Sequence, residues 1–211
     1  MHAGLYFMKG VSYKDMMDYK KLKSDIIEAL LENIAFDGLT WDVVKQTVVD
    51  EGHSTDMADA LFPARMKSVA ADISTYFDSM MMDQLEKVDP ENYRIRDRIK
   101  LAVEKRLEVM SPHKESLLHL TRFWMRGRGG LSGSRSAWST SDKIWNWAGD
   151  TSKDYNHYTK RMLLSGVIVS TFVYWFRDDG ADLTKTFEFL DRRIDNVLKL
   201  GQFIGRFKKA S

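Results

Sequence analysis

Carboxylate and imidazole side chains have the most obvious potential for chemistry in this chain. A di-iron site in a helical bundle uses glutamate and histidine three residues apart on facing helices, and no glutamate here has a histidine three residues later. Glu115 and His119 are four residues apart and would share a helix face, but one pair supplies too few ligands. We therefore expect no metal site and no cofactor, and we expect His113 and His119 to lie at the surface.

Sequence motifs for nucleophiles and for phosphate binding are also missing. The chain has no cysteine, so it has no thiolate nucleophile and no disulfide. It contains neither a Gly-x-Ser-x-Gly turn nor a phosphate-loop lysine. The segment Arg126–Ser136 (RGRGGLSGSRS) either binds an anion through its arginines and backbone N–H groups or forms an exposed linker. We favour the linker, and the sequence predicts no enzyme active site.

The elements that would position any site are helical, because apolar residues recur at i, i+3 and i+4 along most of the chain. We see no strand pattern and expect an all-α fold of about nine or ten helices. Asp150-Thr151-Ser152 should begin the longest apolar helix, since these side chains can accept hydrogen bonds from its first N–H groups. The expected helices cover about residues 22–37, 41–48, 54–61, 65–85, 90–109, 113–124, 138–148, 150–176 and 181–199.

Composition is that of an ordinary soluble protein, with 44% hydrophobic and 29% charged residues among 211. This length supports one sizeable core. We expect a flexible N-terminus over residues 1–14, a single domain over 15–199 and a short basic end over 200–211. The first residues lack the arrangement of a secretory signal. We therefore expect an intracellular protein that reaches a membrane only peripherally.

The first three expected helices resemble a helix-turn-helix in their lengths and spacing, but their charge opposes DNA binding. Residues 1–62 hold six Lys and Arg against eleven Asp and Glu, whereas residues 91–211 hold 23 against 14. The second helix of the motif, Ser54–Leu61, reads STDMADAL and contains two aspartates but no Lys, Arg, Asn or Gln. DNA phosphates would repel this helix. We expect no nucleic-acid partner.

The segment Met162–Phe176 is unusually apolar, and only Ser165, Gly166, Ser170 and Thr171 interrupt it. At about 1.5 Å per residue it spans roughly 22 Å, less than the ~30 Å hydrocarbon core of a bilayer. Such a helix is either buried in a well-filled core or partly covered by a lipid in a cavity. The residues we expect to line such a cavity are Phe77, Met81, Leu164, Ile168, Phe172 and Trp175.

The last residues form a second apolar pattern, in which Leu200, Phe203, Ile204 and Phe207 fall on one helical stripe. Basic residues flank the stripe, as in helices that lie on an anionic membrane surface. The alternative is an end of the chain that docks on the domain. The candidate membrane-binding residues are Phe203, Arg206, Phe207, Lys208 and Lys209.

The sequence IWNWAGDTSKDYNHYTKR (Ile144–Arg161) closely resembles the signature of the coenzyme Q biosynthesis accessory family, the "Coq-nine" lipid-binding proteins. Shorter matches occur at AFDGLT (Ala35–Thr40), LFP (Leu61–Pro63), RIRDRIKLAVEKRLEVMSP (Arg94–Pro112) and FLDRRIDNVLKLG (Phe189–Gly201). Together these matches span about residues 24–201.

The resemblance implies a fold similar to TetR-type regulators, a homodimer and the loss of DNA binding. It also implies a non-enzymatic role, in which an apolar cavity binds an isoprenoid lipid or ubiquinone intermediate and presents it to the di-iron demethoxyubiquinone hydroxylase. The head group would then lie near the hydroxylase-binding surface. A TetR-type ligand-responsive regulator is the alternative. The family's hydroxylase-binding patch corresponds to Asp142, Ile144, Asp154, His157 and Tyr158.

Two departures from the family pattern affect these expectations. The family usually has Trp before the motif's tyrosine, where this chain has His157. Eukaryotic members carry a further amphipathic membrane helix after a linker, and here only Leu200–Lys209 is expected to act in its place. We expect peripheral association with the inner membrane from the cytoplasm in a bacterium, or from the mitochondrial matrix in a eukaryote.

Overall fold

The protein is α-helical throughout the part of the chain that the computed structural model describes, residues 13–125, 130–153, 155–180 and 182–209. Side chains are described for residues 15–125, 133–153, 155–180 and 182–199. No strand occurs in these ranges, which confirms the all-α prediction. The helices are α1 (Tyr13–Asp37), α2 (Trp41–Asp50), α3 (Thr55–Leu61), α4 (Met66–Leu85), η1 (Pro90–Asn92), α5 (Ile95–Met110), η2 (Ser111–His113), α6 (Lys114–Met125), α7 (Gly130–Trp147), α8 (Tyr155–Arg177) and α9 (Thr184–Lys209).

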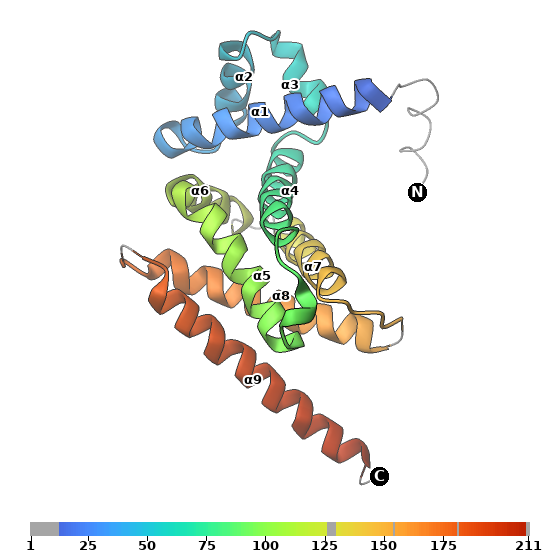
Figure 1. The fold of residues 1–211 in the computed structure, drawn as a ribbon. Coiled ribbons are helices and arrows are strands. Elements are labelled where there is room, and N and C mark those ends of the chain that lie inside the picture. The colour runs from blue at the N-terminus through green and yellow to red at the C-terminus, as the bar shows by residue number, and fades with distance from the viewer. Residues whose placement is uncertain (1–12, 126–129, 154, 181, 210–211) are drawn as a thin grey trace.

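Helices α1, α2 and α3 gather at one end of the molecule, with α1 lying across the other two (Figure 1). Gly38 ends α1 because its φ of +77° is left-handed, a conformation that glycine adopts without strain. Thr40 then caps α2, since its side chain accepts a hydrogen bond from the Val43 N–H at 3.3 Å. Gly52, with φ +83°, forms the turn between α2 and α3. The three helices form the helix-turn-helix-like start that the sequence predicts.

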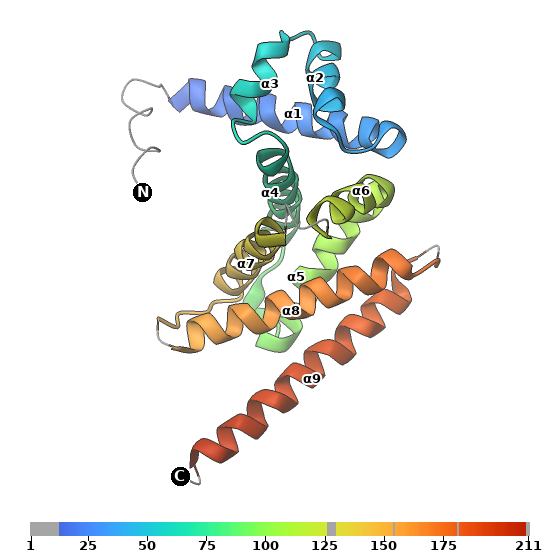
Figure 2. The same ribbon diagram turned by 180° about the vertical axis from the view of Figure 1, so that it is seen from behind.

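Helix α4 leads from this end into the rest of the molecule, where α5 and α7 pack against it (Figures 1 and 2). Its inward residues Ile73, Phe77 and Met81 are fully buried. They join buried residues of α5 and α8, such as Val103 and Ile168, in one hydrophobic core. The residues of the functional site therefore come from helices that share this core.

Helix α9 packs along α8 and then extends beyond it (Figure 2). Arg96 of α5 ties it to the core by ion pairs to Asp191 at 3.0 Å and Asp195 at 2.7 Å. Helix α9 continues to Lys209, so the predicted boundary at residue 199 falls within a continuous helix. The candidate membrane-binding side chains Phe203, Arg206, Phe207, Lys208 and Lys209 lie outside the described side chains, and the predicted flexible segment 1–14 is almost entirely outside the described residues.

The predicted loop Arg126–Ser136 is wrong from Gly130 onward, because α7 begins there. A Cβ at Gly133 would stand only 3.3 Å from the Trp124 ring. The small residues of this segment thus allow α6 and α7 to pack closely, and they do not mark a turn. No described helix is both long enough and apolar enough to cross a membrane.

Two other predictions also need correction. The apolar helix begins at Tyr155 and not at Asp150, because Asp150 binds other side chains, as described below. His113 is half-buried against the Phe77 ring, 5.6 Å between centroids, and this burial lowers its pKa. His119 is half-buried near Gly38, so neither histidine is a freely exposed surface residue.

Candidate functional site

The segment between α7 and α8 begins with a turn that only glycine forms without strain. Gly149 has φ +87°, and its N–H donates to the Asn146 carbonyl at 3.1 Å while the Asp150 N–H donates to the Trp145 carbonyl at 2.9 Å. This pair of hydrogen bonds is a Schellman cap, which satisfies the last carbonyls of a helix. Arg98 of α5 donates to the Ala148 carbonyl at 2.9 Å and fixes the same end.

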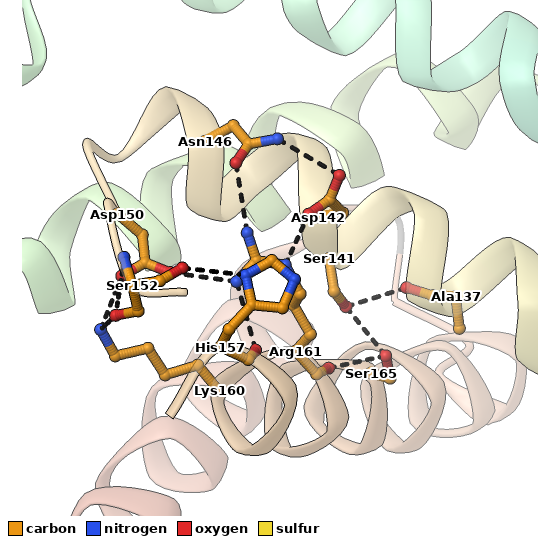
Figure 3. A network of polar contacts seen from close by, with 10 residues as sticks. All are labelled: Ala137, Ser141, Asp142, Asn146, Asp150, Ser152, His157, Lys160, Arg161 and Ser165. Carbon is orange, nitrogen blue, oxygen red and sulfur yellow. Dashed lines mark hydrogen bonds and ion pairs between the residues drawn. The ribbon is translucent and has the colours of Figure 1, made fainter. Parts of the chain in front are cut away.

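The Asp150 carboxylate forms the centre of a buried polar network (Figure 3). One oxygen accepts hydrogen bonds from Lys160 Nζ at 2.7 Å and from the Ser152 hydroxyl at 2.7 Å. The other accepts from Arg161 Nη1 at 3.0 Å. We call the group that surrounds it the hinge network, and its side chains are Asp142, Asn146, Asp150, Ser152, His157, Lys160 and Arg161.

Arg161 is the most deeply buried cation of the hinge network, with 1% of its surface exposed. Its guanidinium donates to Asp142 and Asn146 of α7 as well as to Asp150. Two carboxylates and two cations thus balance each other, which offsets the cost of burying charge. The network fixes the start of α8 against the end of α7.

The ionised form of Asp150 is strongly favoured in the folded protein. Burial by itself raises the pKa of this carboxyl, but hydrogen bonds from Lys160, Ser152 and Arg161 outweigh that effect. The pKa therefore lies far below its ordinary value. Asp150 is a permanent anion that holds the hinge, and it is not a proton donor or acceptor near neutral pH.

His157 and Tyr158 follow the hinge and face different surroundings. His157 is half-buried, and because a carbonyl only accepts, its Nδ1 carries the hydrogen that bonds to the Ser152 carbonyl at 3.1 Å. Tyr158 is 62% exposed, and its ring stacks on Trp138 of α7 with centroids 6.2 Å apart. Tyr158 is therefore available for contact with another molecule, whereas His157 mainly fixes the hinge.

The other predicted hydroxylase-binding residues do not all lie at the surface. Asp142 is partly exposed and is paired with Arg161. Ile144 is fully buried, so its prediction as a contact residue is wrong. Its side chain belongs to the hydrophobic core. Asp154 lies outside the described residues.

A mainly apolar cavity of about 360 Å³ lies between helices α4 and α8. Its volume is at the lower end of the range for small-molecule sites, about 300–1,000 Å³. Helices α4, α5, α6, α7 and α8 all contribute to its wall. The lining residues are Ile73, Ser74, Phe77, Arg106, Met110, Leu117, Leu120, Thr121, Trp124, Met125, Gly133, Ser134, Ser136, Ala137, Thr140, Ile168, Val169, Phe172, Val173 and Phe176.

Three of the six residues expected to line a cavity do so, namely Phe77, Ile168 and Phe172. Met81, Leu164 and Trp175 are buried in the core and are absent from the wall. Trp175, for example, faces Lys114, whose Nζ lies 5.6 Å from the ring centroid. Helical spacing identifies the buried face of each helix, but it does not show which buried residues face an empty space.

The exposed face of α8 joins the mouth of this cavity to Tyr158. Residues three or four apart on a helix share a face, and those on this face are exposed although most are apolar. From Tyr158 to Val173 the distance along the helix is about 22 Å at 1.5 Å per residue. We call this face the α8 stripe, and it consists of Tyr158, Met162, Gly166, Val169 and Val173.

Residues 131–201 match the family model described as COQ9. A probable ubiquinone biosynthesis protein coq9, mitochondrial, of Dictyostelium discoideum is 23% identical over 189 residues. The ubiquinone biosynthesis protein COQ9, mitochondrial, of Homo sapiens is 24% identical over 199 residues. The alignments cover 87% and 91% of this chain and 62% of each relative. The chain is therefore similar to the COQ9 family, to its model over residues 131–201 and to these relatives over most of its length.

The segment that matches the COQ9 model contains α7, α8 and most of α9, and therefore the hinge network and the α8 stripe. A TetR transcriptional regulator from Nitrosomonas europaea ATCC 19718 superposes with a TM-score of 0.67, covering 84% of this chain and 98% of that one. At 14% sequence identity this likeness shows the TetR-like fold alone. The chain spans just under two thirds of the length of the curated COQ9 relatives named above.

The roles of Asp150 and Arg161 were not predicted from the sequence. We expected Asp150 to cap a helix, and we assigned Arg161 no role of its own. Asp142 and Asp150 are eight residues apart, however, and two carboxylates beside a lone arginine at the edge of an apolar run indicate a buried ion pair. The lining residues Ser74, Arg106 and Thr140 carried no comparable signal.

Proposed function

We propose that this protein is a member of the COQ9 family and a non-enzymatic, lipid-binding accessory protein of ubiquinone biosynthesis. The apolar cavity carries the proposal, because a water-insoluble isoprenoid gains about 0.8 kcal/mol for each CH₂ that leaves water. An isoprenoid quinone intermediate is the proposed ligand. A long isoprenoid chain exceeds the cavity, so only part of the molecule would be enclosed.

The α8 stripe supports the second part of the proposal, the presentation of lipid to the di-iron demethoxyubiquinone hydroxylase. Exposed apolar side chains arranged along one helix face favour contact with another protein or with a lipid. Tyr158 stands at one end of the stripe, and Val169 and Val173 stand at the mouth of the cavity. The hydroxylase would therefore dock next to the route by which the lipid leaves.

A homodimer and peripheral association with a membrane complete the proposal. The curated relatives bear names that place them in mitochondria, so the matrix side of the inner membrane is the proposed location. The basic, apolar end of α9 is the proposed membrane contact. Size-exclusion chromatography with light scattering would test the dimer.

The organic extract of the purified protein provides the main test. Mass spectrometry should find an isoprenoid quinone in near-stoichiometric amount. Val173→Arg should reduce the recovered quinone at least several-fold, because a charge at the mouth must be desolvated when an apolar tail passes. Val49→Arg is the matched control, since Val49 is 41% and Val173 44% exposed and Val49 belongs to α2. An extract without any lipid, from a folded protein, contradicts the proposal.

A TetR-type ligand-responsive regulator is the competing function, and the fold alone favours it. The outer face of α3 instead presents Asp56 and Asp59, and Arg65 is paired with Asp59 at 3.4 Å. A gel-shift assay at physiological salt should detect no binding to a duplex DNA pool. Specific retardation by the unliganded protein would favour the regulator.

A further inference from the structure

The apolar cavity opens to solvent at a border that is itself mostly apolar. Four of its lining residues are exposed, and three of these four are hydrophobic. We call the four the cavity rim, and they are Met125 of α6, Ser134 of α7, and Val169 and Val173 of α8. Met125 is 80% exposed, although its side chain is fully apolar. Exposed hydrophobic side chains at the border of a site indicate contact with another apolar surface.

Exposed arginines flank the cavity rim. Arg122 lies three residues before Met125 on α6, and Arg177 lies four residues after Val173 on α8. Each arginine therefore shares a helix face with a residue of the rim. Both side chains are exposed, and neither has an ion-pair or hydrogen-bond partner in the described part of the chain. The positive charges beside the rim are therefore available to an anionic partner.

Acidic residues adjoin the rim in sequence only at the end of α8, where Asp178 and Asp179 follow Arg177. The Asp178 carboxylate accepts hydrogen bonds from the Gly180 N–H at 3.1 Å and the Thr186 hydroxyl at 3.0 Å, which hold it at the start of α9. Residues 116–141, which include the end of α6 and the start of α7, contain four arginines and no acidic residue. The charge of the sequence around the rim is therefore mainly positive.

The ligand itself also limits what the rim contacts. A water-insoluble lipid avoids the cost of crossing water, which grows with its apolar area, only if the rim touches the phase in which the lipid is dissolved. In a cell that phase is a bilayer, and anionic lipids give its surface a negative potential. Apolar side chains bordered by basic ones are typical of protein surfaces that insert at such an interface. The unpaired arginines favour a phosphate-bearing surface over a protein at the rim.

We propose that the cavity rim docks on an anionic phospholipid bilayer, with its apolar side chains at the acyl-chain boundary and with Arg122 and Arg177 at the phosphate groups. The inference rests on the proposed lipid-binding function and adds the surface through which the lipid enters and leaves. In that proposed function the end of α9 provides attachment, whereas the rim provides the passage. Tyr158 is outside the cavity wall and about 22 Å from Val173 along α8. The membrane and the hydroxylase therefore contact separate ends of the α8 stripe.

A fluorescent label at the rim provides the first test, because the chain has no cysteine and Met125→Cys is labelled at one position. Vesicles of equal parts phosphatidylcholine and phosphatidylglycerol should shift the emission of an environment-sensitive fluorophore to shorter wavelength, since the label leaves water. Met17→Cys is the matched control, as Met17 is 47% exposed near the start of α1, on the side away from α6 (Figure 1). Its label should not shift.

An unshifted label at Met125, in a folded chain mixed with these vesicles, overturns the inference. An equal shift at Met17 also overturns it, because adsorption would then be non-specific. A shift at Met125 that requires the hydroxylase and not the vesicles would assign the rim to a protein partner and overturn the membrane contact.

Arg122→Glu combined with Arg177→Glu tests the charge beside the rim. The label at Met125 should need at least tenfold more lipid for half of its shift at low salt, because each arginine near an anionic surface strengthens binding about fivefold. Lys20→Glu combined with Lys21→Glu is the matched control, since both lysines are exposed on α1 and the change in net charge is the same. Equal responses of the two double variants would overturn the inference.

Uptake of ubiquinone separates this inference from the proposed lipid-binding function. The arginine double variant should bind ubiquinone from detergent as the wild type does, because neither arginine lines the cavity. From the same vesicles it should take up ubiquinone at least several-fold more slowly. Equal rates of uptake overturn the inference while lipid binding stands. A label that enters the bilayer on a folded protein that takes up no ubiquinone from either source supports the docking and contradicts the lipid-binding function.

Discussion

Asp150 and Arg161 are two buried charged residues whose ion pairs hold the surface residues near them in position. Each side chain is at most 3% exposed, so their charges interact in a medium far less polarisable than water. Their contacts reach Asp142 and Asn146 of α7 and Lys160 of α8. The position of Tyr158 on the neighbouring surface therefore depends on ion pairs between buried side chains.

Asp150→Asn should destabilise the protein by about 3 kcal/mol at pH 7, because a buried cation loses one of its anions. The folded-state pKa of Asp150 lies below its unfolded value. Its contribution is therefore present above about pH 4 and is lost as the pH falls toward the folded pKa. Urea denaturation followed by circular dichroism should show a smaller difference between wild type and variant at pH 3 than at pH 7. An equal difference at both values would contradict this account.

Tyr158→Ala should weaken capture of the hydroxylase at least tenfold, because a large exposed aromatic residue often dominates a protein contact. The unfolding midpoint should hardly change, since the side chain is mostly exposed. Tyr19→Ala is the control, as Tyr19 is 44% exposed on α1 at the other end of the molecule. Undiminished capture in a pull-down assay would remove Tyr158 from the docking surface.

At the scale of elements, the junction between α7 and α8 combines a glycine cap with an ion-pair network. The Schellman cap ends α7 at a defined residue. The hinge network then sets where α8 starts, so the α8 stripe keeps a fixed rotation about the helix axis. The Schellman cap and the hinge network together position the exposed face of α8, whose opposite face packs in the hydrophobic core.

Gly149→Ala should lower stability by about 1–2 kcal/mol, because the left-handed backbone is costly for a residue with a Cβ. The added Cβ would also stand 3.4 Å from Arg98 Nη1. Gly166→Ala is the opposite control: Gly166 is inside α8 with open space around it, so alanine should stabilise by about 0.5–1 kcal/mol. Thermal denaturation measures the change in stability of both variants. A change of the same sign in both would contradict this explanation.

At the scale of the whole molecule, charge is segregated along the chain. Residues 1–62 carry five more acidic than basic residues, whereas residues 91–211 carry nine more basic than acidic residues. This division should orient the molecule toward an anionic membrane with the start of the chain pointing away. The DNA-binding surface of a regulator would require the opposite distribution.

The full chain should bind vesicles that contain anionic phospholipid, and binding should weaken as salt rises, because salt screens exposed charges. A chain shortened after Lys199 should lose most of this binding, since it lacks Arg206, Lys208 and Lys209 and the apolar residues among them. Co-sedimentation measures both. Equal binding of the two forms would place the membrane contact elsewhere, and neutral vesicles provide the control for non-specific adsorption.

Patterns in the sequence were sufficient to predict the all-α class, the helix-turn-helix-like start, the similarity to COQ9 proteins and the apolar character of α8. These properties follow from local periodicity, from turn residues such as Gly38 and Thr40, and from motifs of consecutive residues. The sequence also predicted three cavity residues correctly, because the buried face of a helix repeats every three or four positions.

The side chains that meet in space follow from the packing of the helices and could not be predicted from the sequence. That packing placed Ile144 in the core, paired Asp150 with Arg161 and put Arg106, Ser74 and Trp124 around one cavity. These outcomes depend on how helices rotate and pack against one another, and a single helix does not encode that rotation. A cavity is a property of the space between several helices, so the spacing of residues within any one of them does not reveal it.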